Sequence, residues 1–111
     1  MTEQTTGGLI PPKLLRLTKA AAVLQLMAAH LEVAAAPIDW EIDDRDGLWP
    51  RVRHGSEDAE SAAETLASAL GAKVNVADVE GMPLYTVYGH WAGIKVSLQA
   101  FGPERAAEVT A

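Results

Sequence analysis

The sequence predicts an α+β fold, in which a five-stranded antiparallel sheet carries two helices on one face. Two segments have the apolar spacing of helices. Five shorter segments are rich in β-forming residues, and four of them alternate between apolar and polar. The predicted order is α-β-β-α-β-β-β, and its short connections favour antiparallel pairing. The 111 residues fit one domain. We expect that domain at 11–102, between a disordered N-terminal tail (1–10) and a flexible C-terminal tail (103–111).

The first helix is predicted to begin after Pro11-Pro12 and to end near residue 35, before Pro37. One apolar stripe follows 3-4 spacing along it; this leucine stripe consists of Leu14, Leu17, Ala21, Leu24, Ala28 and Leu31. Such a stripe packs either on the sheet of its own chain or against a second helix in a dimer. A second apolar strip, the inner strip, lies beside it and consists of Leu15, Ala22, Leu26 and Val33. With both strips, the helix has enough apolar surface to contact its own sheet and another subunit.

Two strands are predicted next, at 38–42 and 49–53, joined by an Asp- and Gly-containing turn. In the first strand three large apolar residues alternate with acidic ones, which is typical of a half-buried strand. Opposing Glu41 to Arg51 and Asp39 to Arg53 pairs opposite charges on the outer face, and this sets the expected register. Mutual pairing with these arginines also explains the carboxylates better than acid–base chemistry does.

A second helix is predicted to be capped by Ser56 and to end at Gly71 in a left-handed conformation. Three strands follow, near 73–79, 83–89 and 93–101, separated by glycine-containing turns. The inward side chains of the sheet are expected to be Ile38, Trp40, Ile42, Val52, Val74, Val76, Ile94, Val96 and Leu98. For strand 83–89 two choices stay open, with either Tyr85 and Val87 or Leu84 and Tyr88 pointing inward.

Composition and charge exclude several classes of function. The chain has no cysteine, which rules out disulfides, thiolate metal sites and cysteine nucleophiles. A formal charge of −6 opposes sequence-independent nucleic-acid binding, although Lys13, Arg16 and Lys19 make the first helix locally basic. No apolar run is long enough to span a membrane, and the N-terminus lacks the basic start of a signal peptide. We therefore expect a cytoplasmic protein that does not bind membranes and binds duplex DNA only weakly; nucleic-acid binding through these three basic residues is a third, less favoured interpretation.

The best candidate binding site is the group Tyr85, Tyr88, His90 and Trp91. Aromatic faces beside a histidine can stack on a planar ligand or anchor a protein partner. The alternative is a structured turn, in which Gly89 and Gly93 permit the bend and Trp91 folds back as a lid on the core. Both interpretations remain open from the sequence.

Sequence motifs for catalysis and metal binding are missing. There is no nucleophile elbow, phosphate loop, dinucleotide fingerprint or HExxH motif. The acidic turn 43–47 has the wrong spacing for a calcium loop, because Arg53 stands where a carboxylate is required. His30, His54 and His90 have no partner at the spacing of a metal site. We expect no enzyme activity, no cofactor and no metal.

These observations predict a small, non-catalytic binding or interaction module that self-associates, as a homodimer through the first helix. The expected interface residues are Leu14, Leu17, Leu24 and Leu31. The alternative is a small-ligand-binding or enzymatic α+β domain with its site around Tyr88 to Trp91. The alanine-rich composition is typical of a high-GC genome, which suggests an accessory protein of an actinobacterial phage or mobile element.

Overall fold

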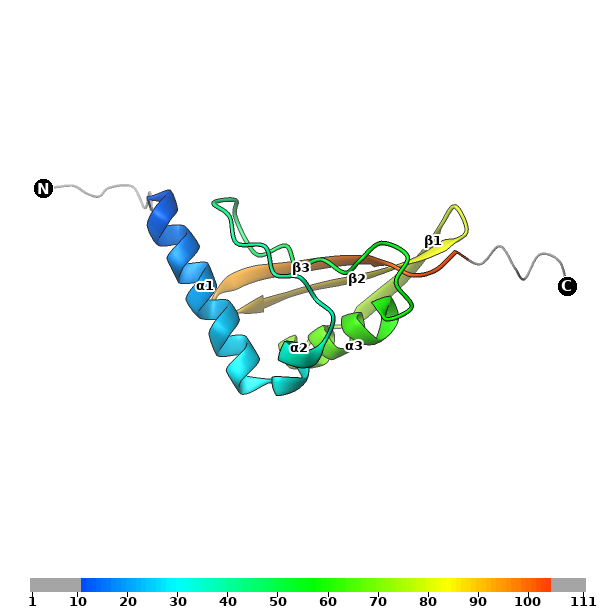
Figure 1. Cartoon of the computed structure of the whole chain (residues 1–111), viewed down its shortest axis with the longest axis horizontal. Coiled ribbons are helices and arrows are strands. Elements are labelled where there is room, and N and C mark those ends of the chain that lie inside the picture. Colours follow the sequence, from blue (N-terminus) through cyan, green and yellow to red (C-terminus); the bar gives the residue numbers. More distant parts are fainter. Residues whose placement is uncertain (1–10, 105–111) are drawn as a thin grey trace, which may run out of the picture.

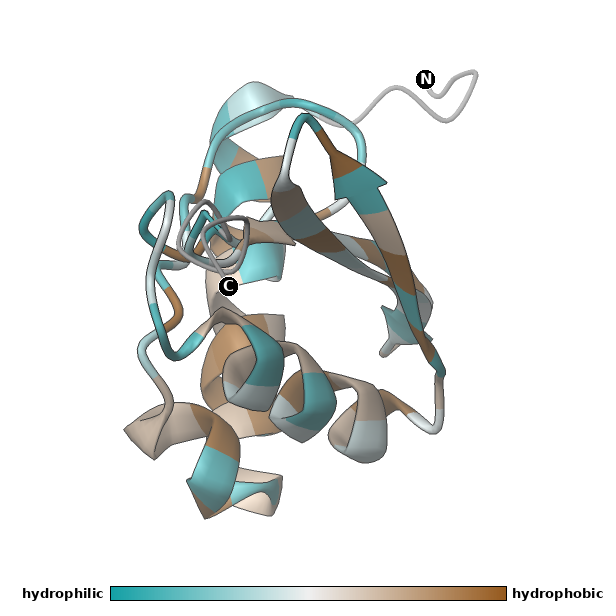
Figure 2. Cartoon of the chain, turned by 90° about the vertical axis from the view of Figure 1, so that its right-hand side faces the viewer, coloured by the Kyte–Doolittle hydropathy of each residue, from teal (hydrophilic) through white to brown (hydrophobic). Residues whose placement is uncertain are grey.

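The computed structural model describes residues 11–104, which contain three helices and a three-stranded sheet. The helices are α1 (Pro12–Ala29), α2 (Leu31–Ala35) and α3 (Ala59–Leu70). The strands are β1 (Val74–Val79), β2 (Met82–Trp91) and β3 (Ile94–Phe101), and they pair antiparallel in the order β1-β2-β3. α2 and α3 lie on one side of this sheet, whereas α1 runs past the end of the sheet that carries the β2–β3 turn (Figures 1 and 2). The predicted N-terminal tail lies outside the described residues, as does most of the C-terminal one.

The predicted α+β class is confirmed, but the prediction of five strands is wrong. Residues 36–58 form no named strand and make only isolated bridges. One of these pairs Asp39 with Arg51, instead of with Arg53 as the predicted register required. The reason is a competing partner, because Leu48 donates its N–H to the Lys95 carbonyl and accepts from the Ser97 N–H, at 2.8 and 2.9 Å. Residues 48–51 therefore run parallel to the free edge of β3, and their pairing with 38–42 is reduced to the single bridge between Asp39 and Arg51.

The predicted long first helix is interrupted at His30. This residue has φ −135° and ψ 84°, which are not helical values, and α2 starts immediately after it. No glycine or proline marks the break in the sequence. The His30 ring instead lies edge-on against the Trp91 ring, with centroids 5.7 Å apart, so a tertiary contact accompanies the break. Leu31 consequently lies beyond the end of α1.

Two tight turns connect the three strands. Glu80-Gly81 and Ala92-Gly93 all have positive φ, between 52° and 85°, which is the conformation of the two-residue turns that fit twisted hairpins. The registers that result place Tyr85 and Val87 on the buried face, opposite Ala100 and Leu98 of β3. This settles the choice that the sequence left open for the middle strand.

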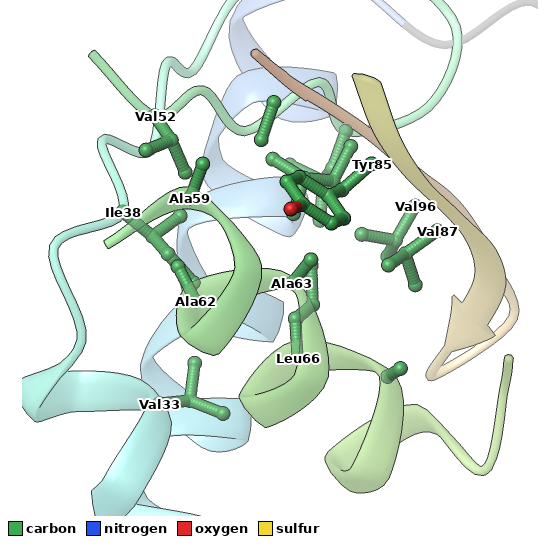
Figure 3. Close-up of a cluster of buried hydrophobic side chains, with 14 of the residues drawn as sticks. Val33, Ile38, Val52, Ala59, Ala62, Ala63, Leu66, Tyr85, Val87 and Val96 are labelled. Carbon is green, nitrogen blue, oxygen red and sulfur yellow. The ribbon is translucent and has the colours of Figure 1, made fainter. Parts of the chain in front are cut away.

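The core lies between the buried face of the sheet and α3 (Figure 3). Most residues that α3 buries are alanines, so its backbone comes close to β2. Residues 38–52 close one side of this core, with Ile38, Leu48 and Val52 buried. Val76 was expected inside but is 59% exposed, because α3 lies mainly over β2 and leaves β1 largely uncovered.

Candidate functional site

The leucine stripe of the first helix faces solvent along its whole length. Its four leucines are 53%, 57%, 68% and 71% exposed, in chain order, and its alanines are exposed as well. The inner strip makes the contacts with the rest of the fold, since Ala22, Leu26 and Val33 are buried. The interpretation in which the leucine stripe packs on the sheet of its own chain is therefore wrong. Of the four leucines predicted at an oligomer interface, Leu14, Leu17 and Leu24 are exposed on α1, and Leu31 is exposed at the start of α2, beyond the break at His30.

A shallow hollow of about 450 Å³ lies beside this stripe. Its helical wall consists of Thr18, Ala21, Ala22 and Gln25, and the β2–β3 turn supplies Ala92 and Ile94. Residues at i, i+3, i+4 and i+7 of a helix are the four that surround an inserted side chain in knobs-into-holes packing. The small alanines and the turn together make a hole that can accept a side chain from another helix.

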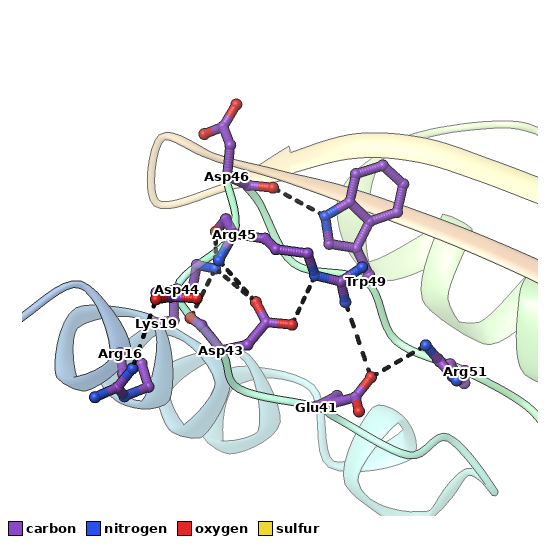
Figure 4. Close-up of polar contacts among 9 residues, drawn as sticks. All are labelled: Arg16, Lys19, Glu41, Asp43, Asp44, Arg45, Asp46, Trp49 and Arg51. Carbon is purple, nitrogen blue, oxygen red and sulfur yellow. Dashed lines mark hydrogen bonds and ion pairs between the residues drawn. The ribbon is translucent and has the colours of Figure 1, made fainter. Parts of the chain in front are cut away.

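A buried lysine fixes the acidic turn 43–47 to α1 (Figure 4). Lys19 is 1% exposed. Its ammonium donates to the carbonyl oxygens of Asp43 (3.1 Å) and Arg45 and contacts the Asp43 carboxylate at 3.4 Å. Arg16 adds an exposed ion pair with Asp44 at 3.9 Å. These contacts assign the turn a structural role, since the carboxylates of Asp43 and Asp44 and the carbonyls of Asp43 and Arg45 already have cationic partners.

The pKa of the Asp43 carboxyl is lowered from its ordinary value. The largest cause is the hydrogen bond from the Arg45 backbone N–H, 3.0 Å from Oδ1, and desolvation opposes it. The Arg45 side chain, with Nε 2.7 Å from Oδ2, and the Lys19 ammonium lower the pKa further. Asp43 is therefore an anion that neutralises the Arg45 guanidinium and the Lys19 ammonium. Its lowered pKa makes it unsuited to exchange protons near neutral pH.

A second concave surface, the arginine groove, lies between residues 49–54 and the outer face of β3. It has a volume of about 530 Å³ and is lined by Asp39, Arg45, Trp49, Pro50, Arg51, Val52, Arg53, His54, Ser97, Gln99 and Phe101. The parallel bridge between Arg51 and Gln99 aligns alternate residues of both segments along this groove. Three arginines thus gather in one place on a chain whose formal charge is −6.

The three arginines of the groove differ in how many ion pairs they form. Arg45 binds Asp43 and also lies 3.9 Å from Glu41. Among residues 11–104, the side chain of Arg51 makes one ion pair, from Nη2 to Glu41 at 3.4 Å. Arg53 forms no ion pair with any of residues 11–104. The sequence predicted that Arg51 and Arg53 form charge pairs across a hairpin. It therefore gave no indication of a groove in which guanidinium N–H groups lack partners among the described residues.

The four residues predicted as a binding site do not come together. Tyr85 and Trp91 point to the face that packs on the helices, whereas Tyr88 and His90 lie on the other face of β2. Trp91 is half-buried at the margin of the core, against His30. Tyr88 is 54% exposed. The sheet separates the two pairs, so they offer no shared cavity; this placement accords with the lid interpretation of Trp91.

Within residues 11–104, no group of three or more His, Cys, Asp or Glu side chains is arranged to hold a metal ion. In the same part of the chain, no helix is long and apolar enough to cross a membrane.

Neither protein-family models, nor curated proteins, nor solved structures gave a match to this chain.

Proposed function

We propose that this protein is a non-catalytic interaction module that self-associates through α1. The observation that supports the proposal most is the exposure of the whole leucine stripe in a fold that already buries the inner strip. A chain this small has few large apolar side chains, and contiguous exposed apolar surface usually marks an interaction site. A cysteine-free sequence also fits the reducing cytoplasm.

A second copy of the chain fits the exposed surface of α1 better than an unrelated partner would. The 3-4 spacing of the stripe is the repeat that keeps two helices in contact as they wind around each other. The same helix supplies both the projecting leucines and the alanine-lined hole. In a two-fold dimer each copy offers its leucines to the holes of the other, so one sequence satisfies both sides of the interface.

Sedimentation velocity on the full chain and on Leu24→Glu tests this proposal. We expect the wild-type protein to be a dimer at high micromolar concentration and Leu24→Glu to be a monomer, because a charge would be buried without a partner at the interface. Leu24 is 68% exposed in the single chain, so the variant should keep the wild-type circular dichroism spectrum. The matched control is Ala29→Glu, which adds the same charge to an exposed position of α1 outside the stripe.

The expected size of the effect follows from the exposed area. Burial of a whole leucine side chain is worth about 1.5–3 kcal/mol, so two-thirds of that from each of two copies gives about 2–4 kcal/mol. The dimer should therefore weaken by a factor of about 30 or more. A monomeric wild-type protein at high micromolar concentration, or equal loss of dimer in Ala29→Glu, would refute the assignment.

A further inference from the structure

We propose that the arginine groove binds a small planar anion, namely an aromatic ring that carries a carboxylate or a phosphate. This binding site is separate from the surface proposed for self-association. Its volume of about 530 Å³ lies in the range of small-molecule sites, about 300–1,000 Å³, and exceeds what a single inorganic ion needs. Three features support the assignment: the aromatic walls, the unused donors and the balance of charge.

The walls of the groove offer flat surfaces for a ring. Trp49 and Phe101 lie on its lining, and His54 packs against Phe101 with ring centroids 5.0 Å apart and an interplanar angle of 40°. Trp49 is held in place by its indole N–H, which donates to the Asp46 carbonyl at 2.9 Å. The Arg45 guanidinium lies over the Trp49 ring, 5.8 Å from its centroid, so a planar ligand would stack on the part of the ring that Arg45 leaves exposed or on Phe101. An inorganic ion would use none of this surface.

The donors for the anionic group come from both sides of the groove. Arg53 has no ion pair among residues 11–104, and the one ion pair of Arg51 leaves most of its guanidinium N–H groups available. Planar guanidinium groups suit carboxylate and phosphate because they bind two oxygens at once. The hydroxyl of Ser97 also lines the groove and is a further hydrogen-bonding group on its β3 side. A ligand oxygen could accept a hydrogen bond from that hydroxyl.

The charge balance favours a ligand with one anionic group over a polyanion. Asp39 also lines the groove, and Glu41 already engages Arg51 and Arg45. The chain as a whole carries −6, which repels a phosphate backbone. One carboxylate or phosphate between Arg51 and Arg53 matches the cations that remain, whereas a nucleic-acid strand would meet uncompensated negative charge.

The test is a titration of ¹⁵N-labelled full-length protein with four probes: benzoate, phenyl phosphate, inorganic phosphate and benzyl alcohol. The readout is the indole N–H signal of Trp49, which can be resolved from those of the other two tryptophans. We expect a saturable shift with one or both aromatic anions and none with the ion or the neutral ring at equal concentration. Whichever of benzoate and phenyl phosphate binds more tightly identifies the anionic group, carboxylate or phosphate, that the groove prefers.

Two variants and one control locate the site. Arg53→Gln should weaken binding about tenfold, since it removes a charge-assisted contact. Asp39→Asn should strengthen binding, by up to about fivefold, because it removes a nearby like charge. The backbone bridge between Asp39 and Arg51 does not use the substituted carboxylate. Arg16→Gln, an exposed arginine outside the groove, should bind as the wild type does.

Several outcomes would overturn the proposal. One is a Trp49 signal that stays unchanged with both aromatic anions up to their solubility limit. Another is equal affinity in Arg53→Gln and wild type, with the spectrum otherwise intact. Tighter binding of a thymidine oligonucleotide than of phenyl phosphate would replace the small ligand by a single-stranded nucleic acid.

Discussion

Substitution of Lys19 measures how much free energy of unfolding comes from the contacts that hold the turn 43–47 to α1. The change Lys19→Met keeps a long apolar side chain in the same buried space but removes the ammonium that binds the carbonyl oxygens of Asp43 and Arg45. We expect the turn to detach from α1 and the protein to lose stability while its helices and sheet persist. The leucine stripe should be unaffected, because Lys19 points to the opposite side of the helix.

The magnitude can be worked from the contacts of Lys19. Two carbonyl groups lose their donor, and a polar group left without a partner costs about 1–3 kcal/mol. The low end applies here because both contacts are only part-buried and water can reach the carbonyls. The carboxylate of Asp43 is not orphaned, because Arg45 donates to it through both its backbone N–H and its Nε. Methionine also avoids the cost of desolvating an ammonium, which offsets part of the loss. We therefore expect the free energy of unfolding to fall by about 2 kcal/mol, at the low end of the summed range.

Urea denaturation followed by tryptophan fluorescence measures this change, with Lys13→Met as the matched control. Lys13 is an exposed lysine on the same helix, so its substitution should change stability by no more than about 0.5 kcal/mol. All samples need equal protein concentration, because self-association adds to apparent stability. If Lys19→Met proves as stable as Lys13→Met, the contacts between Lys19 and the turn 43–47 contribute nothing to the free energy of unfolding. A gain in stability would mean that burying the ammonium costs more than its hydrogen bonds return.

Two further predictions concern Asp43 and Trp91. Because the folded state lowers the pKa of Asp43, its ionised form adds stability above the unfolded value of about 3.9, and that stability is lost as pH falls through the folded pKa. Asp43→Asn should thus be less stable than wild type at pH 7, with a gap that closes in acid; a gap independent of pH would contradict the reasoning. Trp91→Ala should cost about 2–3 kcal/mol, less than the 3–5 typical of a fully buried aromatic residue. Unchanged thermal unfolding of Trp91→Ala would instead identify Trp91 as a contact residue.

The second half of the fold could be predicted from the sequence because its determinants are local. Strands expected at 73–79, 83–89 and 93–101 appear at 74–79, 82–91 and 94–101. β-forming residues mark each strand, and the two-residue turns bring neighbouring segments together without help from the rest of the chain. Gly71 likewise ends α3 with φ 67°, as its position predicted.

The first half was harder to predict because its determinants lie far apart in the sequence. Residues 49–53 resemble a strand, but the segment they belong to bridges both Asp39 and β3, and β3 lies at the other end of the chain. The helix break at His30 coincides with a contact to Trp91. No neighbouring residue in the sequence indicates this break. The arginine groove was missed for the same reason. Arg51 and Arg53 alternate as strand residues do, but only the bridge from Arg51 to Gln99 brings them beside the outer face of β3.

The position of α1 at one end of the molecule affects how an assembled protein would bind ligands. Figure 1 shows this helix at one extreme and the β1–β2 turn at the other. None of the residues that line the arginine groove belongs to α1, so a dimer joined through this helix would keep two open grooves. Such a particle is bivalent: a target that displays two aromatic anions at a matching spacing would be held about a hundredfold or more tightly than by one groove. Dilution below the dimer dissociation constant would remove that gain, so protein concentration itself would regulate capture.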